Sequence, residues 1–163
     1  DKIKKLISKF RKDVPGIAIR TSFIVGYPGE TKKEFKDLID FIEETQFDRL
    51  GVFTYSHEEN TFAYTLKDKL SDQEKNRRAE VLMNAQSRVS YDLNQKKIGK
   101  KFKVLFDRIE EGFYIGRTEF DSPDIDNEVR VSTQSDIKIK PGDFANVVIV
   151  RADHYDLYGE VLL

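Results

Sequence analysis

The sequence predicts an α/β unit followed by a small all-β barrel, because its hydrophobic periodicity changes near residue 100. Before that point, apolar residues recur at three- and four-residue spacing, with two stretches rich in β-branched residues between them. After it the spacing becomes two, which is typical of short strands. We therefore expect the last part of a larger α/β domain over residues 1–70, a connecting helix over residues 71–98 and a five-stranded barrel over residues 99–163.

Composition excludes several classes of site. The 163 residues are 39% hydrophobic and include 12 Phe and 7 Tyr, enough to form a packed core. Cys is absent and only two His occur, which disfavours thiolate, disulfide and zinc sites. No apolar run is long enough to cross a membrane, and no signal peptide is recognisable. We expect a cytoplasmic chain without a membrane partner or a metal site of its own, and its start at Asp1 favours a fragment.

Charge is unevenly distributed along the chain. Residues 1–97 hold 19 basic and 16 acidic side chains, a net charge of +3, and residues 98–163 hold 9 basic and 13 acidic side chains, a net charge of −4. Binding to a nucleic-acid backbone requires a basic surface, so the acidic segment makes that partner less favoured. The segment suits a basic polypeptide, although a solvated acidic face is an equally good interpretation.

The first helix is expected over residues 2–12 and is ended by Pro15-Gly16. Its apolar face is formed by Ile3, Leu6, Ile7 and Phe10. A strand follows over residues 17–25. A parallel strand buried on both faces should be apolar throughout. Arg20 and Ser22 break that rule, so we expect their face to meet something polar.

A turn over residues 26–30 leads into a second helix. Thr31 and Glu34 have the spacing of a capping box, in which each side chain binds the other residue's backbone amide. The helix runs to about residue 44, and a strand follows over residues 47–55. Two strands joined by a helix form a parallel unit, but they cannot close a barrel, so this half is interpreted as incomplete.

A long helix is expected to begin with a second capping box, Ser71 to Glu74, and to end near residue 99. The strands of the barrel are predicted over residues 103–109, 113–117, 129–132, 144–150 and 159–163. Turns at residues 110–112 and 140–143 separate two of the pairs. This pattern is typical of oligonucleotide/oligosaccharide-binding barrels.

Residues 23–30 place an apolar strand end, a glycine, a rigid turn and a helix start in succession. Ligands of parallel α/β folds bind beyond the carboxyl ends of strands. Gly26 lets a flat ring approach the backbone, whose amide and carbonyl groups can bind an adenine edge. A plain strand-to-helix turn explains the same residues and is the favoured interpretation of the motif alone. Arg20 and Ser22 suit a ligand carboxylate or hydroxyl, or else a buried ion pair.

Two further segments carry candidate chemistry. Residues 55–61 contain His57 and two carboxylates at the end of a strand, which suits proton transfer, although a solvated loop is the simpler interpretation. Residues 114–126 combine aromatic and acidic side chains. Aromatic rings can stack on bases, but the surrounding carboxylates favour a polypeptide rich in Arg and Lys, or a loop that only confers solubility.

Taken in order, these segments resemble a known family. Residues 19–31 (IRTSFIVGYPGET) and 53–63 (FTYSHEENTFA) are similar to radical S-adenosylmethionine methylthiotransferases. Residues 114–118, 121–126 and 152–160 resemble the C-terminal TRAM barrel of the RimO branch, which modifies an aspartate of a small-subunit ribosomal protein. The ordered succession is more specific than any single motif.

The resemblance implies a partial TIM-like barrel in residues 1–70, because the family's radical-enzyme barrel has six strands and this chain would keep the last two. It places Ile24, Val25 and Gly26 where the family's backbone meets the adenine of S-adenosylmethionine, and we assign Arg20 and Ser22 to the same site by inference. We expect the ribosomal protein to dock on the barrel. The docking residues proposed are Tyr114, Arg117, Asp121, Asp124, Asp126 and Asp156.

The departure from the family is the absence of Cys. The family uses a CxxxCxxC triplet and three further Cys to hold two four-iron four-sulfur clusters. Without them this chain alone is expected to be inactive, to bind no cluster and to contain no catalytic residue, although the parent enzyme is a transferase. Two alternatives stay open: a fragment of the sibling enzyme that modifies tRNA adenosine, and a non-catalytic binding module. The coding sequence upstream of Asp1 would distinguish enzyme from module.

Overall fold

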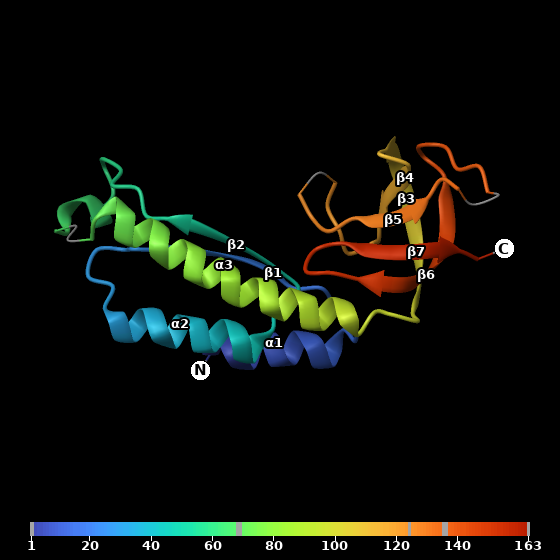
Figure 1. Cartoon of the computed structure of the whole chain (residues 1–163). Helices are drawn as coiled ribbons and strands as arrows, with labels where there is room; N and C mark the ends of the chain where they lie inside the picture. The colour runs from blue at the N-terminus through green and yellow to red at the C-terminus, as the bar shows by residue number, and fades with distance from the viewer. Residues whose placement is uncertain (1, 68–69, 124, 135–136, 163) are drawn as a thin grey trace. The chain divides into compact units, whose positions relative to one another are not determined.

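The chain divides into two compact units, unit 1 over residues 1–89 and unit 2 over residues 90–163 (Figure 1). Helix α3, Asp72–Gln95, contributes residues to both. The computed structural model describes residues 2–67, 70–123, 125–134 and 137–162.

Unit 1 alternates helices and strands as the sequence predicts. Before α3 it contains α1 (Lys2–Asp13), β1 (Arg20–Val25), α2 (Lys32–Thr45), β2 (Arg49–Thr54) and the short 3-10 helix η1 (Phe62–Thr65). Strands β1 and β2 pair in parallel, with Ser22 beside Gly51 and Ile24 beside Phe53. The predicted parallel unit with α2 as its crossover is therefore confirmed.

Local sequence determines where α2 begins. The Thr31 hydroxyl accepts a hydrogen bond from the Glu34 amide at 3.2 Å, and the Glu34 carboxylate accepts one from the Thr31 amide at 2.8 Å. The predicted capping box is confirmed. The helix ends at Gln46, which adopts a left-handed conformation at φ 52°.

One face of the two-stranded sheet packs against helices, and the other face is exposed. A buried cluster joins β1, α2 and α3, and it consists of Val25, Phe35, Ile42 and Leu82. On the opposite face, Ile24 of β1 and Phe53 of β2 are each 61% exposed. Because side chains alternate along a strand, every second residue of β1 belongs to that exposed face.

The strands of unit 1 are shorter than predicted. Strand β1 begins at Arg20 instead of Ile17, because the Ile19 amide donates to the Asp48 carboxylate at 2.9 Å. The Ile19 carbonyl in turn accepts hydrogen bonds from the amides of Asp48 and Arg49. Asp48 thus links the chain segments that lead into β1 and β2, just before the residues at which the two strands pair.

Three helical details differ from the prediction. The apolar face of α1 forms, but only Ile7 is buried, while Ile3 is 64% exposed. Helix η1 was not predicted, and the Thr61 hydroxyl caps it by accepting a hydrogen bond from the Tyr64 amide. Helix α3 ends at Gln95, four residues before the predicted Gly99, in a turn.

Unit 2 is a closed five-stranded barrel in the order β3-β4-β5-β7-β6 (Figure 1). Only β5 and β7 pair in parallel. The strands are β3 (Lys101–Glu110), β4 (Phe113–Arg117), β5 (Val129–Ser132), β6 (Phe144–Ala152) and β7 (Leu157–Val161). The predicted barrel is confirmed, and β4 and β5 have the predicted bounds. Strand β7 begins two residues earlier than predicted, because Leu157 is buried and pairs with Val129 and Ala152.

The barrel closes tightly around its own core. Its buried side chains are Val104, Phe106, Tyr114, Val129, Val131, Ile139, Val147, Ile149, Ala152 and Leu157. At Gly159, a Cβ atom would lie 2.3 Å from Val147 Cγ1 and 2.8 Å from the Val148 carbonyl oxygen. Only glycine permits this approach of β7 to β6.

Candidate functional site

The carboxyl ends of β1 and β2 meet at one edge of the sheet, where Val25 lies beside Thr54. The segments that follow, residues 26–30 and 55–60, both start there. Parallel α/β sheets bind ligands at this kind of edge. The edge and the exposed sheet face beside it form the candidate site of unit 1.

Three predicted cofactor residues share the exposed face of β1. Arg20, Ser22 and Ile24 are all exposed and alternate with residues that face the helices. Val25 has no exposed surface, so its side chain belongs to the core and only its backbone can meet a ligand. The structure therefore brings Arg20, Ser22 and Ile24 together and separates the side chain of Val25 from them.

Gly26 has a structural role beside the predicted one. Its backbone amide donates to the Glu30 carboxylate at 2.5 Å, so an adenine edge would compete with this hydrogen bond, and the adenine contact stays a prediction. Gly26 has φ +79°, and a Cβ atom there would lie 2.5 Å from Cγ of Lys75. Glycine is therefore required twice, for its conformation and for the close approach of α3.

A buried charge network links that turn to α3. Glu30 Oε2 accepts hydrogen bonds from the Gly26 amide and, at 2.8 Å, from the Arg78 guanidinium. Arg78 Nε donates to Glu74 at 3.0 Å, and the guanidinium lies 5.1 Å from the centre of the Phe35 ring. The sequence did not reveal this network, because 48 residues separate Glu30 from Arg78.

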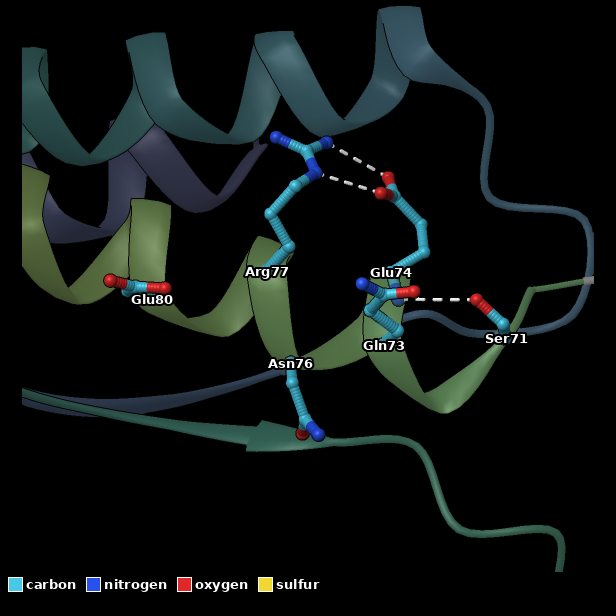
Figure 2. A pocket seen from close by; sticks show the side chains of 6 residues that line it. All are labelled: Ser71, Gln73, Glu74, Asn76, Arg77 and Glu80. Atoms are coloured by element: carbon cyan, nitrogen blue, oxygen red, sulfur yellow. Dashed lines mark hydrogen bonds and ion pairs between the residues drawn. The ribbon is translucent and has the colours of Figure 1, made fainter.

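Glu74 is also held by its other neighbour on α3. Figure 2 shows the two hydrogen bonds that Arg77 donates to it, at 2.7 and 2.9 Å. The hydrogen bonds from Arg77 and Arg78 lower the pKa of Glu74 to about 2. The Ser71 hydroxyl accepts a hydrogen bond from the Glu74 amide at 3.3 Å, as the predicted helix start requires.

An aromatic row lies beside the same edge. The ring centroids of Tyr27 and Tyr55 are 5.5 Å apart, those of Tyr55 and His57 are 5.9 Å apart, and His57 stacks on Tyr64 at 4.6 Å. The Tyr55 hydroxyl and His57 Nδ1 are 3.1 Å apart. The predicted loop of residues 55–61 is therefore organised by stacking, and its carboxylates Glu58 and Glu59 are exposed. The signal that sequence reasoning passed over is the aromatic residue that follows each strand.

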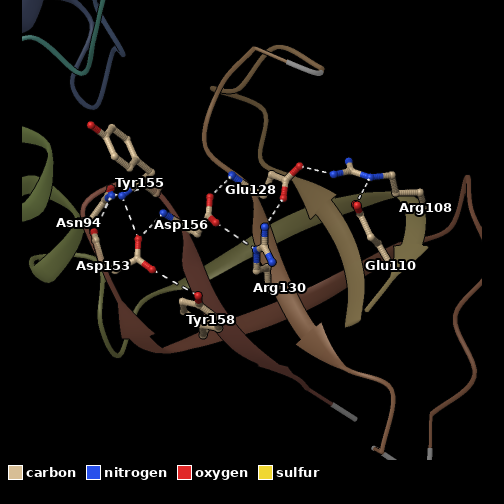
Figure 3. A network of polar contacts seen from close by, with 9 residues as sticks. All are labelled: Asn94, Arg108, Glu110, Glu128, Arg130, Asp153, Tyr155, Asp156 and Tyr158. Carbon is tan, nitrogen blue, oxygen red and sulfur yellow. Dashed lines mark hydrogen bonds and ion pairs between the residues drawn. The ribbon is translucent and has the colours of Figure 1, made fainter. Parts of the chain in front are cut away.

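Unit 2 carries a surface network of paired charges (Figure 3). Arg108 binds Glu110 at 2.8 Å and Glu128 at 2.5 Å. Arg130 binds Glu128 and Asp156, each at 3.0 Å. Two Arg side chains pair with three carboxylates here, so the network keeps one of the excess acidic charges of this unit.

The turn before β7 is organised by Asp153. Its carboxylate accepts hydrogen bonds from the amides of Tyr155 and Asp156 at 2.9 and 2.7 Å and from the Tyr158 hydroxyl at 3.2 Å (Figure 3). Burial acts to raise the pKa of Asp153, but these hydrogen bonds outweigh it and lower the pKa. Burial raises the pKa of Asp156, only partly offset by the hydrogen bond from the Glu128 amide.

Two of the predicted docking residues are not available to a partner. Tyr114 is 8% exposed, packs against Phe106 in the core and donates its hydroxyl to the Ile137 carbonyl at 3.3 Å. Asp121 is 7% exposed and accepts a hydrogen bond from the Thr118 hydroxyl at 2.5 Å. Both predictions are wrong, because these side chains stabilise the barrel and its loop.

The other docking residues lie in two places. Arg117 and Asp126 line a pocket of about 130 Å³ between β3, β4 and the loop before β5. In this pocket Arg117 pairs with Asp107 at 3.1 Å, and the Asp126 carboxylate accepts a hydrogen bond from the Ser122 amide at 2.7 Å. Asp156 belongs to the charge network instead, and Asp124 lies outside the described residues.

Within the part of the chain that the structure describes, no group of three or more His, Cys, Asp or Glu side chains could hold a metal ion. The same residues contain no helix long and apolar enough to span a membrane. The sequence has no Cys to ligate the four-iron four-sulfur clusters that the family resemblance implies.

Residues 98–162 match the family model of the TRAM domain. Over 161 residues, 99% of its length, the chain is 53% identical to the ribosomal protein uS12 methylthiotransferase RimO of Cytophaga hutchinsonii. It is 51% identical to the RimO of Flavobacterium psychrophilum and 49% identical to that of Caldanaerobacter subterraneus, over 98% of its length in both cases. The chain spans only 36–37% of the length of these relatives. The chain is thus similar to a part of the RimO methylthiotransferases, and its residues 98–162 match the TRAM domain.

Proposed function

We propose that this chain is part of a radical S-adenosylmethionine methylthiotransferase that adds a methylthio group to an aspartate of ribosomal protein uS12. The observation that carries the proposal is about 50% identity over nearly the whole chain to the ribosomal protein uS12 methylthiotransferases RimO. In this proposal, residues 1–70 complete the radical-enzyme domain, and residues 99–163 form the docking barrel. Residues 71–98 form the helix that connects the two. The enzyme acts in the cytoplasm, where ribosomes are assembled.

Unit 1 supplies part of the wall for S-adenosylmethionine. Strands β1 and β2 are taken as the last two strands of the catalytic barrel, so their exposed face is directed to its interior. Ile24 presents a 61% exposed side chain there, and Arg20 and Ser22 follow on the same face. In this arrangement Ile24 packs on the adenine, while Arg20 and Ser22 bind polar groups of the cofactor. The Gly26 amide holds the turn through Glu30, so an adenine edge would compete with that hydrogen bond.

The iron–sulfur clusters belong to a part of the enzyme outside this chain, because this sequence has no Cys. When bound, they supply the electron that cleaves S-adenosylmethionine. We therefore expect the 163-residue chain alone to have no transferase activity. Its own residues bind the cofactor and dock the substrate.

The barrel is proposed to dock uS12, a basic polypeptide. Support comes from the net charge of −4 over residues 98–163 and from the pocket that Arg117 and Asp126 line. Asp156 contributes less than expected, because Arg130 already pairs with it. The acidic charge disfavours the alternative tRNA substrate of the sibling enzyme.

The experiment uses the complete polypeptide that contains this chain, with both clusters reconstituted anaerobically. Incubation with uS12, S-adenosylmethionine and a sulfur source should add the mass of one methylthio group to an aspartate-containing peptide of uS12. Modification of tRNA with uS12 unchanged would establish the sibling function instead. A polypeptide that begins at Asp1 and has no Cys-containing portion would establish the non-catalytic module.

A further inference from the structure

Helix α3 reaches the turn that follows β1 through the buried side chain of Arg78. Its Nη1 atom donates to Glu30 Oε2 at 2.8 Å and to the Glu30 carbonyl oxygen at 3.3 Å. The same Oε2 atom accepts the Gly26 amide hydrogen bond at 2.5 Å. One carboxylate oxygen therefore joins the guanidinium of α3 to the backbone of the candidate cofactor turn.

Because the pair of Arg78 and Glu30 is buried, the loss of one partner should affect the other strongly. The side chains of Arg78 and Glu30 are only 3% and 12% exposed. If the guanidinium is removed, Glu30 keeps a charge that is almost enclosed and has lost its counter-ion. The carboxylate then gains by turning towards water, and this movement releases the Gly26 amide.

A second contact from α3 acts on the same glycine. The side chain of Lys75 packs where a Cβ atom of residue 26 would lie, and Lys75 is 4% exposed. Its amino group lies 5.3 Å from the centre of the Tyr55 ring, on the segment that follows β2. Packing by Lys75 and hydrogen bonding through Glu30 thus restrain Gly26 from two directions.

We propose that Arg78 is a positioning residue for S-adenosylmethionine, acting through Glu30 on the Gly26–Glu30 turn. The inference rests on the proposed function, because the turn is taken to border the cofactor. Arg78 itself does not touch the ligand. It fixes the backbone direction at the end of β1, and a ligand loses affinity when the groups that bind it are no longer preorganised.

The test compares Arg78→Gln with Arg77→Gln in the complete, reconstituted polypeptide. Arg77 is the matched control, since it also binds Glu74 but its side chain is 56% exposed, whereas that of Arg78 is 3% exposed. Hydrogen–deuterium exchange of the peptide that contains Gly26 reports the turn without cofactor. Titration with S-adenosylmethionine reports the Kd.

Arg78→Gln should speed exchange at Gly26 and weaken S-adenosylmethionine binding by about tenfold or more. It should raise KM for the cofactor and leave kcat within about twofold, because the turn binds ground and transition states alike. Arg77→Gln should change neither quantity, and Arg78→Lys, which keeps the charge, should restore part of the affinity.

Unchanged exchange and unchanged Kd in folded Arg78→Gln, with the unsubstituted enzyme binding normally, would overturn this inference and leave the proposed function intact. Failure of the unsubstituted enzyme to bind S-adenosylmethionine would overturn both. If Arg78→Gln does not fold, Glu30→Gln keeps the side-chain shape and tests the same link. A normal Kd in that variant would also overturn the inference.

Discussion

The two units differ in how the edges and faces of their sheets are covered. The barrel of unit 2 closes, so each of its strands has two neighbours and its core is enclosed on all sides. Unit 1 contains a two-stranded sheet with helices on one face only. On its other face, side chains as apolar as Ile24 and Phe53 remain exposed.

The difference distinguishes a unit whose sheet is closed on itself from a unit whose sheet leaves one face open to a ligand. In unit 2, Arg108 and Arg130 pair with carboxylates of the same unit (Figure 3), and the buried residues hold the barrel. In unit 1, the exposed sheet face meets the edge where both strands end, which is where α/β folds place ligands. The open face is therefore the part of the molecule that we assign to the cofactor.

The prediction with the largest expected effect compares a Phe→Ala substitution in one unit with a Phe→Ala substitution in the other. Phe106→Ala in the barrel, where the ring is 1% exposed, should reduce the free energy of unfolding of unit 2 by about 3–5 kcal/mol. Phe53→Ala on the open face, where the ring is 61% exposed, should change that of unit 1 by less than about 0.5 kcal/mol. Urea titrations followed by NMR signals from each unit measure both, and equal costs would refute the contrast.

A smaller effect is expected from adding a methyl group to a glycine in each sheet. Gly159→Ala should destabilise the barrel by about 1–3 kcal/mol, because the new Cβ overlaps Val147 and the Val148 carbonyl. Gly51→Ala should stay within about 0.5 kcal/mol, since its Cβ would meet atoms of Phe53 and Ser22 no closer than 3.6 Å. The same urea titrations apply. A barrel that tolerates Gly159→Ala would show that β6 and β7 are not tightly packed.

The smallest expected effect is the change in stability with pH in the acid range. Glu74 in unit 1 has its pKa lowered from 4.5 to about 2 by Arg77 and Arg78, so its contribution to stability is present above pH 4.5 and is lost as the pH falls towards 2. Burial raises the pKa of Asp156 in unit 2 above 3.8, so its contribution is present below pH 3.8 and is lost as the pH rises through the raised pKa. Carboxyl ¹³C titration should place the Glu74 midpoint below that of Asp156, and the reverse order would contradict these assignments.

Local features of this chain were readable from sequence, and distant contacts were not. The capping box of Thr31 and Glu34 depends on residues three positions apart, so its prediction succeeded. The alternation of β1 correctly placed Arg20 and Ser22 on one face.

The failures arise where tertiary structure decides. In β4, neighbouring Tyr114 and Ile115 are both buried, so alternation could not show that the Tyr114 ring faces the core. Glu30 lies only four residues after Gly26, but its counter-ion Arg78 is 48 residues away, and the sequence does not indicate that pairing. Such pairs become visible only when α3 is packed against the sheet.

Hydrogen–deuterium exchange of the complete, reconstituted polypeptide, with and without S-adenosylmethionine, tests the central claim most directly. The account predicts that the cofactor slows exchange in peptides covering residues 20–30 and leaves the barrel strands, residues 101–161, unchanged. Protection of the barrel strands, with none at residues 20–30, would contradict the assignment of the open sheet face to the cofactor.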